Sequence, residues 1–152
     1  LLFVLILVNA FFAMSEIAII SLNDNMIDKL AEEGHKKAKL IKKLTAISTP
    51  DGFIGMDVDR LENSAGELVC LAHEMGHCLT GSFYTLDSDL CQRQRCEERA
   101  HRWAVETLVP LKDLKRALEM GLPPHELAEV FGVTEEFLEK CLRYYHEAKG
   151  EI

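Results

Sequence analysis

The sequence predicts an α+β fold that is mainly helical, with one short β-hairpin, and with a membrane-spanning helix before it. Residues 1–22 contain eighteen apolar side chains, enough to cross a hydrocarbon core of about 30 Å. Two short runs that favour strands flank a Pro-Asp-Gly turn at 50–52. From residue 64 onward, apolar residues recur at helical spacing between Gly and Pro breaks. The 152 residues have room for one ordinary domain and an appendage.

The first domain, residues 1–45, is expected to be a transmembrane helix followed by a basic juxtamembrane helix. Residues 23–44 have helical spacing and hold six Lys against four acidic residues. Basic residues flank the cytoplasmic ends of spans, so the downstream chain is expected in the cytoplasm. No initiator Met and no basic segment precede the span, which argues against a cleavable signal peptide, and the missing Met leads us to expect a fragment or a chain that begins upstream.

This segment is similar to a known membrane domain. The runs SEIA-x-x-SL and LAEEG-x-x-KAK, within residues 1–45, resemble the start of the transmembrane domain of CorC/haemolysin-C (CNNM-like) proteins. That domain has several further membrane spans, whereas the sequence after residue 45 has no second apolar run of that length. The resemblance therefore implies membrane contact through residues 1–22 and no transport function.

The second domain is expected over residues 46–152. Strands are predicted at 45–48 and 53–58, on either side of the turn, and the second strand is expected to pair with an extended substrate by strand addition. The Ser64-x-x-Glu67 capping box predicts a helix from near Ala65 to Gly81. A loop over 82–92 follows, and Pro and Gly breaks then separate helices predicted at 94–108, 111–120, 125–131 and 134–148.

The charge of this domain argues against nucleic acid as a direct partner. From residue 49 onward, eleven Lys and Arg stand against twenty Asp and Glu, whereas phosphate binding needs a basic face. The last two helices have a helix-turn-helix outline, but Glu135, Glu136 and Glu139 would repel phosphates, so we expect a packing or partner-binding element. The five Cys are odd in number and form no C-x-x-C pair, which predicts free, buried thiols in a reducing compartment.

The HEMGH run at residues 73–77 has the pattern of a metal site. His73 and His77 are four residues apart, so one helix face presents both imidazoles to one ion. Glu74 lies at the adjoining edge, where it can act as a general base. A catalytic zinc site also needs a third protein ligand and an open position.

Glu97 on the following helix is the expected third ligand. Ala100 and Ala104 continue its stripe at helical spacing, and such small residues let two helices pack closely. Glu98 and His101 are the alternatives for this ligand.

The same region resembles the ImmA/IrrE family of metallo-endopeptidases. The resemblance rests on CLAHEMGHCLTGSFY, CEERAHRWAVETLVP and ELAEVFGVTEEFLEKCL, within residues 46–148. It implies a zincin-like metallopeptidase domain, with Zn2+ as cofactor and a cytoplasmic location. The family's H-E-x-x-H and E-x-x-A motifs correspond here to His73, Glu74, His77 and Glu97. The implied substrate is a helix-turn-helix repressor of a mobile element or a stress response.

One position departs from that family. The family usually has Asp or Asn four residues after the ligand Glu, where it can hydrogen-bond and orient a ligand His, and here that position is His101.

Two aromatic side chains also need an interpretation. Tyr84 could stabilise an oxyanion, but packing within its loop is the commoner role and is our expectation, and Trp103 is expected in the core.

The sequence therefore predicts a zinc-dependent endopeptidase acting on a protein substrate. It is expected in the cytoplasm, or anchored in the membrane with the peptidase domain on the cytoplasmic side. The alternative is a non-enzymatic, membrane-anchored interaction module, which would be either a truncated CorC-like protein or an artificial fusion.

Overall fold

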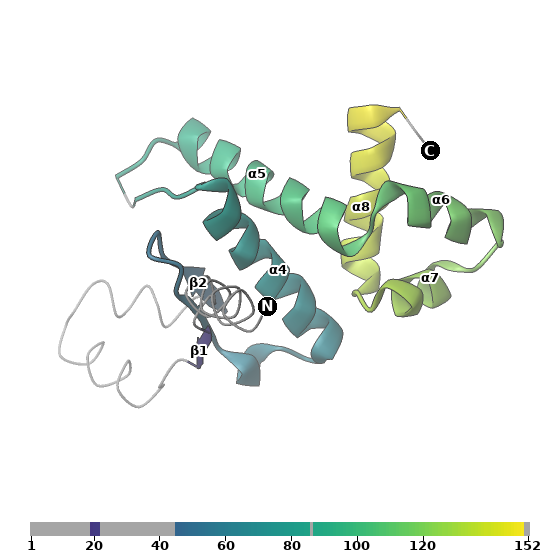
Figure 1. The fold of residues 1–152 in the computed structure, drawn as a ribbon, viewed down its shortest axis with the longest axis horizontal. Coiled ribbons are helices and arrows are strands. Elements are labelled where there is room, and N and C mark those ends of the chain that lie inside the picture. Colours follow the sequence, from purple (N-terminus) through teal and green to yellow (C-terminus); the bar gives the residue numbers. More distant parts are fainter. Residues whose placement is uncertain (1–18, 22–44, 86, 151–152) are drawn as a thin grey trace, which may run out of the picture.

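A computed structural model describes residues 19–21, 45–85 and 87–150 (Figure 1). These residues form a mainly helical α+β fold, as predicted, with five α-helices, one 3-10 helix and a three-stranded sheet. The helices are α4 (Ser64–Thr80), α5 (Leu90–Leu108), α6 (Leu111–Glu119), α7 (Pro124–Phe131) and α8 (Glu135–Lys149).

The predicted β-hairpin is present. Strands β2 (Ala46–Ser48) and β3 (Ile54–Met56) pair in antiparallel register. Gly52 closes the turn between them with φ 86°, a left-handed conformation that favours glycine, and its N–H donates to the carbonyl of Thr49 at 3.0 Å. The second strand ends earlier than predicted, because the 3-10 helix η1 (Val58–Arg60) follows it.

A third strand corrects two expectations. β1 (Ile19–Ser21) pairs in parallel with β3, so the sheet has the order β1-β3-β2. The sheet therefore has one strand more than the predicted hairpin, and residues 19–21 form a strand where a membrane-spanning helix over 1–22 was predicted. The rest of that predicted helix and the predicted basic helix lie outside the described residues. Of the helices in the described part of the chain, none has the length and apolar character needed to cross a membrane.

The position of β3 also contradicts the expected strand addition. A substrate segment can join a sheet only at an edge with free backbone groups. β3 is the central strand, because β1 and β2 pair with its two edges. The expectation that residues 53–58 accept an extended substrate is therefore wrong for this arrangement.

Local capping sets where the two long central helices begin. Asn63 caps α4, because its Oδ1 accepts the N–H of Gly66 at 2.8 Å, so Ser64 is the first helical residue rather than the predicted cap. Asp89 caps α5 by accepting the N–H of Gln92 at 2.6 Å. This cap starts α5 at Leu90, earlier than the predicted residue 94.

The main hydrophobic core lies where α5 meets α6, α7 and α8 (Figure 1). Leu127 on α7 and Phe137 on α8 are buried there, so the helix-turn-helix-like segment packs its apolar face into the core, and the absence of DNA binding stays a prediction. Trp103 packs against this core, as predicted. All five cysteines are free, but the expectation of buried thiols holds only for two of them, since Cys91 is exposed and two more are half-buried.

α4 and α5 pack closely along the predicted small-residue stripe. A Cβ on Gly76 would lie 2.5 Å from the carbonyl oxygen of Ala100, so the two backbones approach at this point. Ala100 and Ala104 have no exposed surface. This approach places Glu97, one turn before Ala100, against the face of α4 that bears the two motif histidines.

Candidate metal centre

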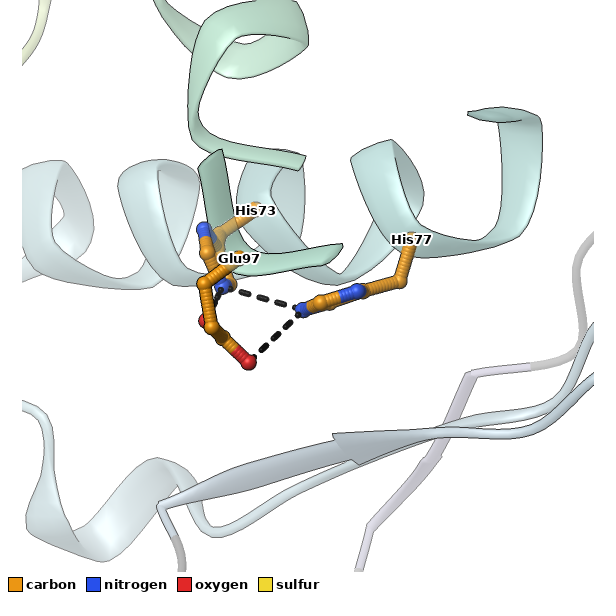
Figure 2. Close-up of side chains that lie close together, drawn as sticks. All are labelled: His73, His77 and Glu97. Atoms are coloured by element: carbon orange, nitrogen blue, oxygen red, sulfur yellow. Dashed lines mark hydrogen bonds and ion pairs between the residues drawn. The ribbon is translucent and has the colours of Figure 1, made fainter. Parts of the chain in front are cut away.

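Three side chains from α4 and α5 converge on one point. His73 and His77 project from successive turns of α4, and Glu97 projects from α5 toward both (Figure 2). His73 Nε2 lies 3.1 Å from Glu97 Oε2 and 3.2 Å from His77 Nε2, and His77 Nε2 lies 3.6 Å from Glu97 Oε1. Glu98 and His101, the alternatives for the third ligand, are not part of this group.

These distances, which involve both oxygens of Glu97, are close to those around one tetrahedral zinc ion. Bonds of about 2.0–2.2 Å at tetrahedral angles put neighbouring ligand atoms roughly 3.3–3.6 Å apart. Two imidazoles and one carboxylate also form the three-ligand set of catalytic zinc sites, which leaves a position open for water. The side chain of Glu97 is 42% exposed, so solvent reaches the cluster from one side. The structure thus brings the three residues together, while their role as zinc ligands stays a prediction.

The backbone after α4 orients His77. Gly81 adopts φ 62° and ends the helix as predicted, and the chain turns back so that the carbonyl oxygen of Ser82 lies 2.6 Å from His77 Nδ1. When Nδ1–H donates to this oxygen, the lone pair of Nε2 faces the cluster. Ser82 was not among the residues predicted from the sequence, although the glycine stop at 81 was a signal for a turn over the last helical histidine.

Tyr84 lies at the cluster and does not pack within its loop as expected. Its hydroxyl donates to Glu97 Oε1 at 2.6 Å, and its ring centroid lies 6.3 Å from that of His77. The bond to Glu97 and burial, together with the charges of Glu97 and Glu74, raise the pKa of Tyr84 to about 12. The hydroxyl therefore stays protonated near neutral pH and keeps its donor.

Glu74 lies beside the cluster rather than in it. It follows His73 directly on α4, and its negative charge contributes to raising the pKa of His77 and of Tyr84. The same charge adds to burial in raising the pKa of the thiols of Cys70 and Cys78, one turn away on either side of Glu74. Glu74, the predicted general base, is thus not one of the three clustered residues.

Two residues of the cluster, Glu97 and His77, have pKa shifts of opposite sign. Hydrogen bonds from His73 and His77 hold the pKa of Glu97 well below its ordinary value, against the effect of burial. Burial alone would lower the pKa of His77, but its bonds to Glu97 and to the Ser82 carbonyl outweigh this and raise it. Glu97 is therefore ionised across the neutral range, and His77 binds a proton more tightly than a free imidazole.

His101 lies near the cluster in a partly apolar setting. Its ring meets that of Phe137 edge-on, with centroids 5.9 Å apart. Burial lowers the pKa of His101, and the charges of His73 and Lys140 act in the same direction. A neutral imidazole thus occupies the position where the resembled family has Asp or Asn.

Two family models match the chain in the order expected from the sequence. Residues 60–143, more than half of the chain, match a peptidase family model described as the IrrE N-terminal-like domain. Residues 1–53 match the Cyclin M transmembrane N-terminal domain, and this match extends over β2 and the hairpin turn. Neither the comparison with curated proteins nor the comparison with solved structures gave a match.

Proposed function

The chain belongs to the IrrE N-terminal-like family of metallopeptidases, and from this membership we propose that it is a zinc-dependent endopeptidase. The observation that supports the proposal most is the spacing of the donor atoms of His73, His77 and Glu97, which suits one tetrahedral ion. All three residues lie within the segment that matches the family model.

In this mechanism, bound zinc would acidify a water molecule and polarise the scissile carbonyl. Glu74 accepts the proton of the attacking water on its carboxylate and later donates it to the leaving amine. The position of Glu74 directly after His73 on α4, outside the group of three, supports this role, because proton transfer needs a carboxylate that does not itself hold the metal.

The proposed substrate is a helix-turn-helix repressor of a mobile element or a stress response. Family membership supports a protein substrate, and the repressor is what the ImmA/IrrE resemblance implies. The acidic composition after residue 49 is consistent with it, since a DNA-binding partner has a basic face, and opposite charges speed association.

The test uses the full chain with zinc and a purified candidate repressor. Glu74→Gln is expected to retain zinc and to lose cleavage, because it removes only the proton acceptor. Glu67→Gln, an exposed position on the same helix, is the matched control and is expected to cleave like the parent. A Glu74→Gln chain that cleaves as fast as the parent would contradict the mechanism.

The match of residues 1–53 to a transmembrane domain supports a second candidate, a membrane-anchored interaction module without enzymatic activity. This candidate, as a truncated CorC-like protein or an artificial fusion, predicts firm membrane association without bound metal. Fractionation of cells expressing the full chain, with zinc measured in the purified protein, separates the candidates. Zinc bound in membrane-extracted chains would support an anchored peptidase. Protection of the peptidase domain from protease added to sealed right-side-out vesicles would place that domain on the cytoplasmic side.

A further inference from the structure

The two oxygens of the Glu97 carboxylate have different neighbours. Oε1 accepts the hydroxyl proton of Tyr84 at 2.6 Å and lies 3.6 Å from His77 Nε2, whereas Oε2 lies closer to a motif histidine, 3.1 Å from His73 Nε2. We propose that Tyr84 is a positioning residue, which holds Oε1 by this hydrogen bond and so presents Oε2 as the single metal-binding oxygen of Glu97. The inference rests on the proposed function, since it requires a metal at the cluster.

The carboxylate needs such a partner because of its position. Glu97 is a long side chain, 42% exposed, and in water it would move among several rotamers. A short O–H···O⁻ bond to an ionised carboxylate is among the stronger protein hydrogen bonds and fixes both distance and direction. The hydroxyl of Tyr84 therefore selects one orientation of a side chain that its own helix leaves free.

Tyr84 is itself held against the cluster. Its ring packs edge-on to His77, and the ring of the preceding Phe83 also lies near His77, with centroids 6.4 Å apart. The Cys96 thiol, one residue before Glu97, contacts the carbonyl oxygen of Phe83 at 3.5 Å and joins the loop to α5.

The same short loop thus acts on ligands from both helices. The Ser82 carbonyl accepts from His77 on α4, and two residues later the Tyr84 hydroxyl donates to Glu97 on α5. Partners of this kind orient metal ligands, and their loss typically costs about 10–100-fold in metal affinity or activity.

The test is Tyr84→Phe in the full chain, which removes the hydroxyl and keeps the ring. We expect the zinc dissociation constant, from competition with a chromogenic chelator, to rise about 10–100-fold. With cobalt(II) in place of zinc, we expect weaker visible absorption bands, because a released carboxylate can bind through both oxygens and raise the coordination number. An effect on folding alone would not change the spectrum of bound cobalt.

Tyr144→Phe is the matched control. Its hydroxyl donates to Glu106 Oε1 at 2.8 Å, a bond of the same type between α8 and α5 that involves no residue of the cluster. We expect this variant to keep the parent's zinc affinity and cobalt spectrum.

A double-mutant cycle with Glu97→Gln tests whether Tyr84 acts through Glu97. In that background, Tyr84→Phe is expected to change zinc affinity little, because the ionised acceptor is already absent. The inference is overturned if the parent binds zinc while Tyr84→Phe matches it in affinity and cobalt spectrum, or if the two substitutions are additive. A parent that binds no zinc would overturn the inference and the proposed function together, whereas normal cleavage by Glu74→Gln would overturn only the proposed catalysis.

Discussion

His101 is the residue at which this chain departs from the family pattern near the metal cluster. A neutral imidazole is a weaker acceptor than an ionised carboxylate for the N–H of a ligand histidine. We therefore expect His101→Asp to raise zinc affinity, by up to about tenfold. Competitive zinc titration of the two chains checks this. A lower affinity in the variant would mean that the imidazole itself supports the site.

The raised pKa of His77 makes the metal-free chain sensitive to pH. Its folded pKa lies above the ordinary 6.5, so its contribution to stability is complete below 6.5 and is lost as the pH rises through the folded value. Glu97, with its lowered pKa, stays ionised throughout this range and does not oppose the trend. The lowered pKa of His101 opposes the trend only up to about the unfolded value of 6.5, so we expect the Tm of the metal-free chain to fall as the pH rises from about 7 to about 8.

With zinc bound, we expect the effect of pH on the Tm to have the opposite sign, because protons compete with the metal for the His77 imidazole. The zinc-induced rise in Tm should therefore be larger at the higher pH. His77→Gln should flatten the pH dependence of the metal-free chain, whereas His125→Gln, at an exposed position, should leave it unchanged. A parent whose metal-free Tm rises over this interval would contradict the assignment to His77.

The sequence could predict the residues of the cluster that follow helical spacing. His73 and His77 lie one turn apart, so periodicity groups them, whereas Glu97 was favoured by its alanine-backed stripe and by the E-x-x-A motif of the resembled family. Ser82 and Tyr84 escaped because their roles depend on the path of a loop and, for Ser82, on a backbone carbonyl. No periodic pattern encodes either of these features.

At the level of elements, the close approach of α4 to α5 makes Gly76 the most constrained glycine of α4. In Gly76→Ala, the new Cβ would lie 2.5 Å from the Ala100 carbonyl oxygen, so the helices must separate. We expect a loss of about 1–3 kcal/mol in the free energy of unfolding, and weaker zinc binding because α5 positions Glu97. Urea denaturation measures the first effect and zinc titration the second.

Gly66 provides the matched control on the same helix. A Cβ there would meet only Asn63 Oδ1, at an ordinary 3.5 Å. Gly66→Ala should be neutral or stabilising by up to about 1 kcal/mol, because alanine has the higher helix propensity. Equal stability of the two variants would show that the helices do not pack as closely as described.

The start of α4 gives a separate test at the same scale. Asn63→Ala is expected to cost about 1 kcal/mol of stability, because the N–H of Gly66 loses its side-chain acceptor. Ser64→Ala, at the first helical position, should have little effect. Urea denaturation of both variants decides between these residues, and a larger loss for Ser64→Ala would restore the capping box predicted from the sequence.

Helix positions followed from local signals, whereas the sheet did not. Apolar periodicity and the Gly and Pro breaks located α4 to α8 to within a few residues, since those signals act over one or two turns. β1 was missed because its residues continue a long apolar run, and because its pairing with β3 joins segments more than thirty residues apart. Such contacts leave no local pattern in the chain.

On the scale of the whole molecule, the first family match ends within the hairpin, at residue 53, and the second begins at residue 60. Strands β1 and β2 fall in the segment that matches the Cyclin M transmembrane domain, whereas α4 and α5 fall in the peptidase match. The sheet beside α4 is thus built partly from residues of the first segment. The domain boundary between residues 45 and 46 stays a prediction.

The central claim is that His73, His77 and Glu97 hold one zinc ion beside a catalytic Glu74. Its most direct test measures the zinc content of the purified full chain together with cleavage of a candidate repressor, for the parent and for Glu74→Gln. We predict about one zinc per chain in both proteins, with cleavage by the parent alone. A parent without bound zinc, or a Glu74→Gln chain that still cleaves, would contradict the account.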